Sequence, residues 1–327
     1  MEAPDRNLAL DLVRVTEAAA LSSARWLGRG DKNAGDQAAV DAMRLSFDTI
    51  NIAGVIVIGE GEKDEAPMLY GGEEVGTGTG PAMDVAVDPV EGTRLLAYGR
   101  PNAISVVGVA PRGSMFDPGP SFYMQKLVVP SAARDAVDLD APVADNLKAV
   151  AKALSKDVDD LVVFVLDKPR HQQLIADIRT AGARIQLHTD GDVAGSLMAL
   201  DPKDMVDVMM GTGGTPEGVL SACAIRAVGG QMFARLDPQS DSERQNLLDS
   251  GVDLKRVLTA EELVTSPDTF FAATGISGGT WLEGVSFSGS GAVTHSLVLR
   301  GKTGTMRRIE SHHTWDKLMR FSAVKYD

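Results

Sequence analysis

Strands that alternate with helices in the second half of the sequence constrain the fold more than any other feature. Short apolar runs of strand length occur at residues 161–166, 184–188, 205–210 and 231–236. Segments with helical spacing separate these runs, at residues 169–181, 193–200 and 216–228. Such an alternation predicts a parallel sheet with right-handed crossovers, and therefore a fold of the α/β class.

The first half of the chain has a different pattern. Two helical segments, from Asn7 to Leu27 and from Asp36 onward, precede the first buried strand. Further strands are expected over four apolar runs, at residues 54–58, 84–87, 103–109 and 126–129. We expect two lobes: an N-terminal lobe over residues 1–155 and a C-terminal α/β lobe over residues 156–327.

Charge and cysteine content narrow the class of protein. The 327 residues carry a formal net charge of −13, which would repel a nucleic-acid backbone. An anionic metabolite would also be repelled unless local cations, helix N-termini or metal ions reverse the field. The single cysteine, Cys223, excludes a disulfide or a multi-thiolate metal site within one chain. Without a signal-like N-terminus or a membrane-length apolar run, we expect a cytoplasmic protein with no membrane partner.

Polar loops follow three of the strands in the second half. They are Asp167-Lys168-Pro169-Arg170, Asp190-Gly191-Asp192 and the segment from Gly211 to Gly218. Loops at the carboxyl ends of parallel strands converge on one edge of the sheet, where ligands bind. Each loop alone is consistent with helix caps and solvent-exposed turns, but the three together favour a binding site. Lys168 and Arg170 supply the positive charge that a phosphate requires.

The glycine-rich loop that begins at Gly211 leaves an alternative open. It follows a strand and opens a helix, and Asp237 follows about twenty residues later, as in a dinucleotide-binding site. Pro216 occupies the last glycine position of that fingerprint, and Glu217 would repel the pyrophosphate. A metal ion between Glu217 and a phosphate removes this repulsion, so we favour a metal site over an NAD-binding oxidoreductase.

Carboxylates accumulate at turns and strand ends of the first half, namely Asp36, Glu60, Glu62, Asp64, Asp88 and Glu91. Oxygen ligands without a His/Cys cluster favour Mg²⁺ or Mn²⁺. The Pro turn between Asp88 and Glu91 could hold ions, a phosphate and the attacking water together. Asp36 is equally consistent with a helix N-cap, and residues 60–65 with a solvated loop.

The histidines suggest no catalytic group. His312 and His313 are adjacent, so their side chains diverge on any regular element. His171, His188 and His295 are isolated in the sequence, and we expect surface or hydrogen-bonded structural roles for them. The chain has no nucleophile-elbow motif, and covalent catalysis therefore has no support.

Asp88-Pro89-Val90-Glu91-Gly92-Thr93 resembles the Asp-Pro-(apolar)-Asp-Gly-Thr/Ser motif of the lithium-sensitive, metal-dependent phosphatases, with Glu91 in place of the second Asp. That variant is similar to the class II fructose-1,6-bisphosphatases of the GlpX type. The resemblance continues, in order, through Trp26–Asn33, Val57–Glu62, Asp64–Tyr70, Lys168–Arg170, Asp190–Asp192 and Gly213–Gly218.

This resemblance implies a layered α/β/α/β/α sugar-phosphatase fold, a homo-oligomer (dimer or tetramer), and Mn²⁺ or Mg²⁺ as cofactor. The metal ligands that it implies are Asp36, Glu60, Asp88, Glu91 and Glu217. The catalytic residues that it implies are Lys32, Asp64 and Thr93. The substrate-binding residues that it implies are Glu91, Gly92, Thr93, Tyr123, Lys168, Pro169, Arg170, Asp190, Gly191, Asp192 and Gly214.

The implied reaction is hydrolysis of the 1-phosphate of fructose 1,6-bisphosphate by metal-activated water, in gluconeogenesis. Thr93 and Asp64 would orient and deprotonate the water, while Lys168 and Arg170 would anchor the distal phosphate. Asp190 or Asp192 would accept hydrogen bonds from sugar hydroxyls. Sedoheptulose 1,7-bisphosphate and other sugar or inositol phosphates remain alternative substrates, and a dinucleotide-binding oxidoreductase remains the alternative of another class.

Overall fold

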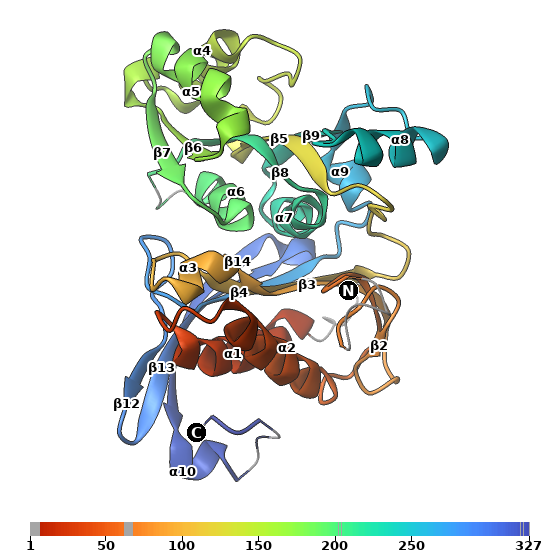
Figure 1. The fold of residues 1–327 in the computed structure, drawn as a ribbon, viewed down its shortest axis with the longest axis vertical. Helices are drawn as coiled ribbons and strands as arrows, with labels where there is room; N and C mark the ends of the chain where they lie inside the picture. The colour runs from red at the N-terminus through yellow and green to blue at the C-terminus, as the bar shows by residue number, and fades with distance from the viewer. Residues whose placement is uncertain are drawn as a thin grey trace. The chain divides into compact units, whose positions relative to one another are not determined.

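The computed structural model describes residues 7–61, 68–201, 203, 205–320, 322 and 324–326. The chain divides into two compact units (Figure 1). The first unit comprises Met1–Ser114 and Ser266–Asp327, and the second comprises Met115–Thr265. Both units combine helices with a mixed sheet, so the chain has the expected α/β class.

The division between the units differs from the expected boundary near Ser155. That residue lies inside the second unit, directly after α4 (Val143–Leu154). The chain leaves the first unit after β4 (Ile104–Pro111) and returns to it before β11 (Phe270–Gly275), and these two strands pair along their length. Because this pairing joins residues far apart in the sequence, local patterns could not reveal that the second unit is an insertion.

The sheet of the first unit is ordered β12-β13-β11-β4-β3-β1-β2, with β14 paired to the remaining edge of β13. Its other strands are β1 (Ala53–Ile58), β2 (Glu74–Val75), β3 (Ala82–Glu91), β12 (Ser286–Ser288), β13 (Gly291–Arg300) and β14 (Thr305–Thr314). β1 and β3 run parallel, and the other strand pairs of this sheet are antiparallel.

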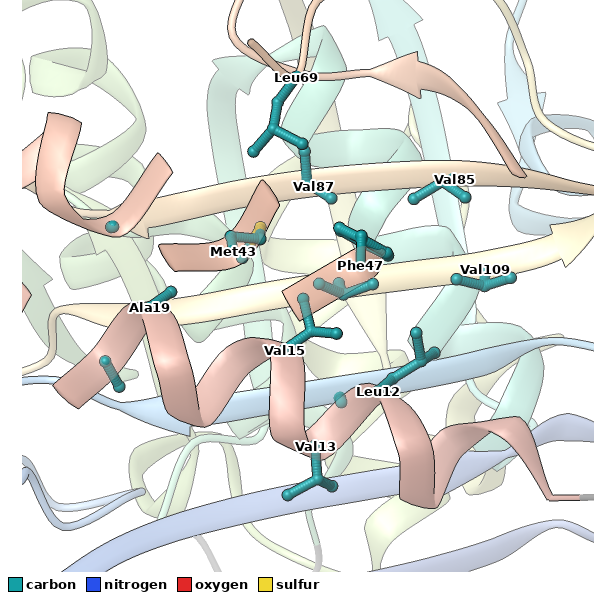
Figure 2. Packing of buried hydrophobic residues seen from close by; sticks show 14 of the residues in the cluster. Leu12, Val13, Val15, Ala19, Met43, Phe47, Leu69, Val85, Val87 and Val109 are labelled. Atoms are coloured by element: carbon teal, nitrogen blue, oxygen red, sulfur yellow. The ribbon is translucent and has the colours of Figure 1, made fainter. Parts of the chain in front are cut away.

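Two helices cover one face of this sheet, α1 (Leu8–Ser23) and α2 (Lys32–Phe47). Apolar residues of α1 recur at helical spacing and pack against alternate residues of the strands, as Figure 2 shows for Leu12 and Val109. Phe47, from the last turn of α2, is fully buried in the same cluster. The short α3 (Thr93–Ala97) follows β3, and α10 (Trp315–Leu318) follows β14.

The sheet of the second unit is ordered β10-β9-β5-β8-β6-β7. Its strands are β5 (Tyr123–Val129), β6 (Val162–Leu166), β7 (Arg184–His188), β8 (Val208–Gly214), β9 (Gln231–Leu236) and β10 (Leu258–Thr259). The expected parallel arrangement is confirmed for β6 with β7 and β8. β9 runs in the same direction as these strands but does not pair with them, because β5 lies between β8 and β9 and is antiparallel to both.

Helices cover both faces of this second sheet. α4 and α5 (Gln172–Ala181) pack on the face that carries Val163 and Val165. α6 (Asp192–Leu200) and α7 (Thr215–Val228) pack on the opposite face, toward which Phe164 points. α8 (Asp241–Asp249) and α9 (Ala260–Leu263) complete the unit. Among the helices that the structure describes, none combines the length and hydropathy that a membrane span requires.

Close packing of α6 on β6 depends on Gly195. A Cβ atom at this position would overlap the aromatic ring of Phe164. We therefore expect Gly195→Ala to lower the free energy of unfolding by about 1–3 kcal/mol, the usual cost of overpacking a filled core. Denaturant titration measures the change. Gly289→Ala is the control because no atom of the described residues lies within 4 Å of a Cβ there, and an equal effect of both substitutions would contradict the packing argument.

Candidate active site

The turn at the end of β3 presents two carboxylates. Asp88 pairs with Val106 of β4, and Glu91 pairs with Ile104, so β3 contains an extra residue between them. Such a bulge bends the strand and redirects its side chains. Carboxylate oxygens of Asp88 and Glu91 lie within 4.8 Å of each other. Asp88 Oδ1 also accepts a 3.0 Å hydrogen bond from the Val90 N–H, which holds the turn.

Gly92 connects this bulge to α3. Its φ of +90° lies in the left-handed region, and a Cβ there would lie 2.9 Å from Leu95 Cδ1. Gly92 is the N-cap residue of α3, and no side chain caps this helix. Thr93 is the first helical residue, so the structure assigns it no capping role.

Glu60 follows β1 at the same end of the sheet. The parallel register pairs Ile58 with Ala86, which places Glu60 and Asp88 two residues beyond paired positions on neighbouring strands. The sequence offered a solvated loop as the alternative for residues 60–65. Glu60 is only partly exposed, and its N–H donates to the Leu69 carbonyl at 2.8 Å. Asp64, a predicted catalytic residue, lies outside the described residues.

Asp36 and Lys32 lie one turn apart at the start of α2. The N-cap of this helix is Asp31, whose Oδ1 accepts a 3.0 Å hydrogen bond from the Ala34 N–H. The alternative that Asp36 is the cap is therefore wrong. Burial raises the pKa of Asp36, and the charge of the exposed Lys32 opposes the shift.

Glu217 is the carboxylate of the second unit that best fits a metal ligand. It lies in the first turn of α7, and its side chain folds over Gly214, where a Cβ would overlap Oε2. Oε2 is buried and has no hydrogen-bond partner in the part of the chain that the structure describes. Burial raises the pKa of Glu217 to about 7; Asp192 and Asp190 add to the shift, and Lys126 opposes it. A buried carboxylate oxygen with no partner fits a group that binds a cation.

A buried ion pair lies beside Glu217. Lys126 Nζ contacts Asp192 Oδ2 at 2.6 Å, and the two residues are 1% and 4% exposed. Gly213 must be glycine because a Cβ would overlap Asp192 Oδ2. Sequence reasoning placed Lys126 in a strand and assigned it no role. The available signal was a lysine directly before the apolar run Leu127–Val129.

Arg170 is held in place by the tip of β8. Its Nε and Nη2 both donate to the Thr212 carbonyl, at 3.0 and 2.8 Å, and its guanidinium lies 5.1 Å from the centre of the Tyr123 ring. Two predicted substrate-binding residues are thus in contact. A third and fourth, Lys168 and Asp190, approach each other to 3.9 Å.

The His171 side chain links the turn that carries Arg170 to β8 through contacts at both ring nitrogens. Its Nδ1 lies 2.7 Å from the Leu166 carbonyl, which can only accept, so Nδ1 carries the proton. Nε2 accepts a 2.7 Å hydrogen bond from the Thr212 N–H. Burial lowers the pKa of His171, in keeping with a neutral ring. The expected structural role of this histidine is confirmed.

Asp237 completes this network, because its Oδ2 accepts a 2.7 Å hydrogen bond from the Thr212 hydroxyl. In the dinucleotide alternative this acidic side chain would bind a ribose. Because Asp237 instead accepts a hydrogen bond from a residue of the glycine-rich loop, we favour a structural role for it. Thr212 was missed by sequence reasoning because nothing local marks it as the common partner of Arg170, His171 and Asp237.

Comparison with known proteins identifies the family. The sequence model of one family, the bacterial, glpX-encoded fructose-1,6-bisphosphatases, matches residues 6–313 of this chain. The chain belongs to this family. It is 47% identical over 325 residues to fructose-1,6-bisphosphatase 1 class 2 of Escherichia coli K12, covering 95% of this chain and 96% of that protein. The class 2 enzyme of Shigella flexneri matches to the same extent.

Membership of the glpX family agrees with the geometry of each unit. This is a metal-dependent phosphatase family, and the described part of the chain supplies acidic groups that could bind a metal. The first unit brings together Asp88 and Glu91 on one bulge. The second brings together Tyr123 with Arg170, and Lys168 with Asp190. The individual catalytic and substrate-binding roles stay predictions.

The hydrogen bonds of His171 generate a prediction about pH. The unfolded chain binds a proton at His171 below about pH 6.5, whereas burial opposes protonation in the folded state. Stability conferred by the neutral ring is therefore present above this pH and is lost as the pH falls. We expect His171→Gln, which cannot titrate, to flatten the fall in unfolding free energy between pH 6.5 and 5 by up to about 1.4 kcal/mol per pH unit.

Denaturant titrations at a series of pH values measure this slope. The exposed neighbour Gln172 provides the control, and Gln172→Ala should keep the wild-type slope. A His171→Gln slope identical to that of wild type would show that the folded ring binds a proton as readily as the unfolded chain does.

Proposed function

We propose that the chain hydrolyses the 1-phosphate of fructose 1,6-bisphosphate, producing fructose 6-phosphate and inorganic phosphate. The observation that carries this proposal is the paired carboxylates of Asp88 and Glu91, held on a bulge directly before Thr93. Family membership and 47% identity to class 2 enzymes support the choice of substrate. We further propose a gluconeogenic role, a cytoplasmic location and a homo-oligomer (dimer or tetramer), with no nucleic-acid or membrane partner.

The proposed metal ligands are Asp36, Glu60, Asp88, Glu91 and Glu217. All five offer carboxylate oxygens, a donor set that suits Mn²⁺ or Mg²⁺ better than zinc. When bound, such ions stabilise the charge on the phosphoryl oxygens and make a water more acidic. The buried Oε2 of Glu217, which has no hydrogen-bond partner among the described residues, supports its inclusion in this set.

The remaining chemistry falls to side chains near the bulge. Thr93 begins α3 directly after Gly92, and we propose that its hydroxyl orients the attacking water. Asp64 would accept the proton of that water, and Lys32 would assist catalysis. Gly92 would let the sugar phosphate approach the backbone, because glycine has no side chain that could block it.

The distal phosphate requires cations, because the chain as a whole carries a net charge of −13. We propose that Lys168 and Arg170 supply them at the strand tips. Thr212 engages Nε and Nη2 of Arg170, so the guanidinium is fixed before the substrate arrives. Other proposed substrate contacts are Glu91, Thr93, Tyr123, Pro169, Asp190, Gly191, Asp192 and Gly214.

Asp190 is better placed than Asp192 to accept hydrogen bonds from sugar hydroxyls. Asp192 Oδ2 is already bound to the buried Lys126. The Asp190 side chain is 32% exposed and lies 3.9 Å from Lys168. The two neighbouring loops that carry Asp190 and Lys168 could therefore bind a hydroxyl and a phosphate of one ligand.

A substrate panel separates the proposed reaction from its alternatives. Phosphate release would be measured with fructose 1,6-bisphosphate, sedoheptulose 1,7-bisphosphate and inositol phosphates. Preferential hydrolysis of fructose 1,6-bisphosphate supports the proposal. NAD binding without any phosphate release would favour the oxidoreductase alternative.

Metal dependence is the first expected property of the enzyme. Chelation should abolish phosphate release, Mg²⁺ or Mn²⁺ should restore it, and lithium should inhibit it. Asp88→Asn keeps the shape of the side chain and removes its charge, so we expect loss of turnover and weaker Mn²⁺ binding in titration calorimetry. Asp41→Asn is the control, because Asp41 accepts a hydrogen bond from Gln37 within α2. Full activity of the metal-stripped protein would refute the proposal.

Recognition of the distal phosphate can be tested separately. We expect Arg170→Ala to raise KM for fructose 1,6-bisphosphate by about tenfold, equivalent to about 1.4 kcal/mol. Fructose 1-phosphate lacks the distal group, so it should be a poor substrate that the substitution affects little further. Arg179→Ala, on the exposed surface of α5, is the control. Equal proportional losses on both substrates would mean that Arg170 does not read the second phosphate.

A further inference from the structure

Two histidines and two glutamates gather at the β14 edge of the first unit. His295 lies on β13, Glu310 and His312 lie on β14, and Glu283 precedes β12. The antiparallel register places His295 directly opposite Glu310. His312 is two residues beyond Glu310, so both side chains project from the same face of β14. One strand thus offers two ligands and its neighbour offers a third.

Glu310 lies close to both histidines, although the donor atoms of the three residues are not all within 4.8 Å of one another in the structure. His295 Nε2 lies 3.9 Å from Glu310 Oε2, and His312 Nε2 lies 2.6 Å from Glu310 Oε1. Ligands of a tetrahedral ion with bonds of about 2.0–2.1 Å lie about 3.3 Å apart, between these two values. The side chains of Glu310 and His312 are 61% and 71% exposed. Rotation of the exposed His312 and Glu310 side chains is therefore needed to bring all three donors onto one ion.

The ring of His295 already has a ligand's orientation. Its Nδ1 faces Glu283 Oε2 at 3.5 Å, an arrangement in which a carboxylate leaves Nε2 as the donor to a metal. Nε2 is buried and has no hydrogen-bond partner among the described residues. A buried polar atom of this kind requires a partner. The facing Glu310 is too distant to provide a hydrogen bond.

The cavity beside His295 and the charge of its walls also favour the binding of a cation. A surface cavity of about 370 Å³ is lined by Glu283, His295 and Glu310, with Arg308 also on its wall. Arg308 donates through Nη1 to the Trp281 carbonyl at 2.9 Å. The two carboxylates outweigh its single positive charge, and the cavity leaves room for a water ligand.

We propose that His295, Glu310 and His312 bind a divalent transition-metal ion of the zinc type, with Glu283 orienting His295. Two imidazole nitrogens distinguish this site from the oxygen-only carboxylates of Asp88 and Glu91, which suit hard ions. The bound ion joins β14 to β13 through side chains, in addition to their backbone ladder. This site is independent of the hydrolytic reaction.

The test is Zn²⁺ binding to the full-length protein in the presence of saturating Mg²⁺, measured by competition with a chromophoric chelator. Wild type should bind one ion that His312→Gln and His295→Gln lose. Glu283→Gln should weaken the affinity for this ion by about tenfold or more, as expected for an orienting carboxylate. Asp145→Asn should bind as wild type does, because the Asp145 side chain is as exposed as that of Glu310 but lies in the second unit.

Two comparisons make the result decisive. His312 is exposed, so His312→Gln removes a ligand with no change to the core, and circular dichroism checks that the variant is folded. Asp88→Asn should retain the Zn²⁺ ion even if it loses phosphate release, which separates this site from the proposed reaction. Identical Zn²⁺ stoichiometry and affinity in wild type, His295→Gln and His312→Gln would overturn the proposal.

Discussion

A fully buried lysine organises the strand tips of the second unit. Lys126 Nζ reaches Asp192 at 2.6 Å, with almost no water access to either residue. Removing one partner of such a pair costs about 3–5 kcal/mol, because the other charge stays buried without compensation. Asp192 opens α6, Gly213 leaves room for its carboxylate, and Lys126 moderates the raised pKa of Glu217. The segments that carry Asp192 and Glu217 therefore both depend on the buried ion pair between Lys126 and Asp192.

The sequence predicted much of the candidate site because its strongest signals are local. A carboxylate directly after a buried strand, a glycine that precedes a helix and charged strand tips can all be recognised without a fold. Asp88, Glu91 and Glu217 became candidate metal ligands in this way. Lys126 and Thr212 could not be, since their partners lie tens of residues away and depend on how β5 and β8 pair.

Strand direction and chain routing were also beyond sequence reasoning. The apolar pattern of Leu127–Val129 is the same in either orientation, so it could not show that β5 runs antiparallel to β8 and β9. Similarly, Asp36 was given an N-cap as its alternative role because the second helical pattern was expected to begin there. In the structure the N-cap is Asp31, whose side chain accepts a hydrogen bond from the Ala34 N–H. Helix boundaries depend on such single hydrogen bonds.

The pairing of β4 with β11 has an evolutionary consequence. Val109 pairs with Phe270, so the points where the chain leaves and re-enters the first sheet lie on adjacent strands. Met115 and Val264 form a further bridge just beyond them, within the second unit. A short hairpin could therefore close the first sheet without the insertion, as is typical of domains that tolerate exchange at closely spaced termini. The loops of the inserted unit can therefore change together as a module, while the strand that carries Asp88 and Glu91 keeps its neighbours.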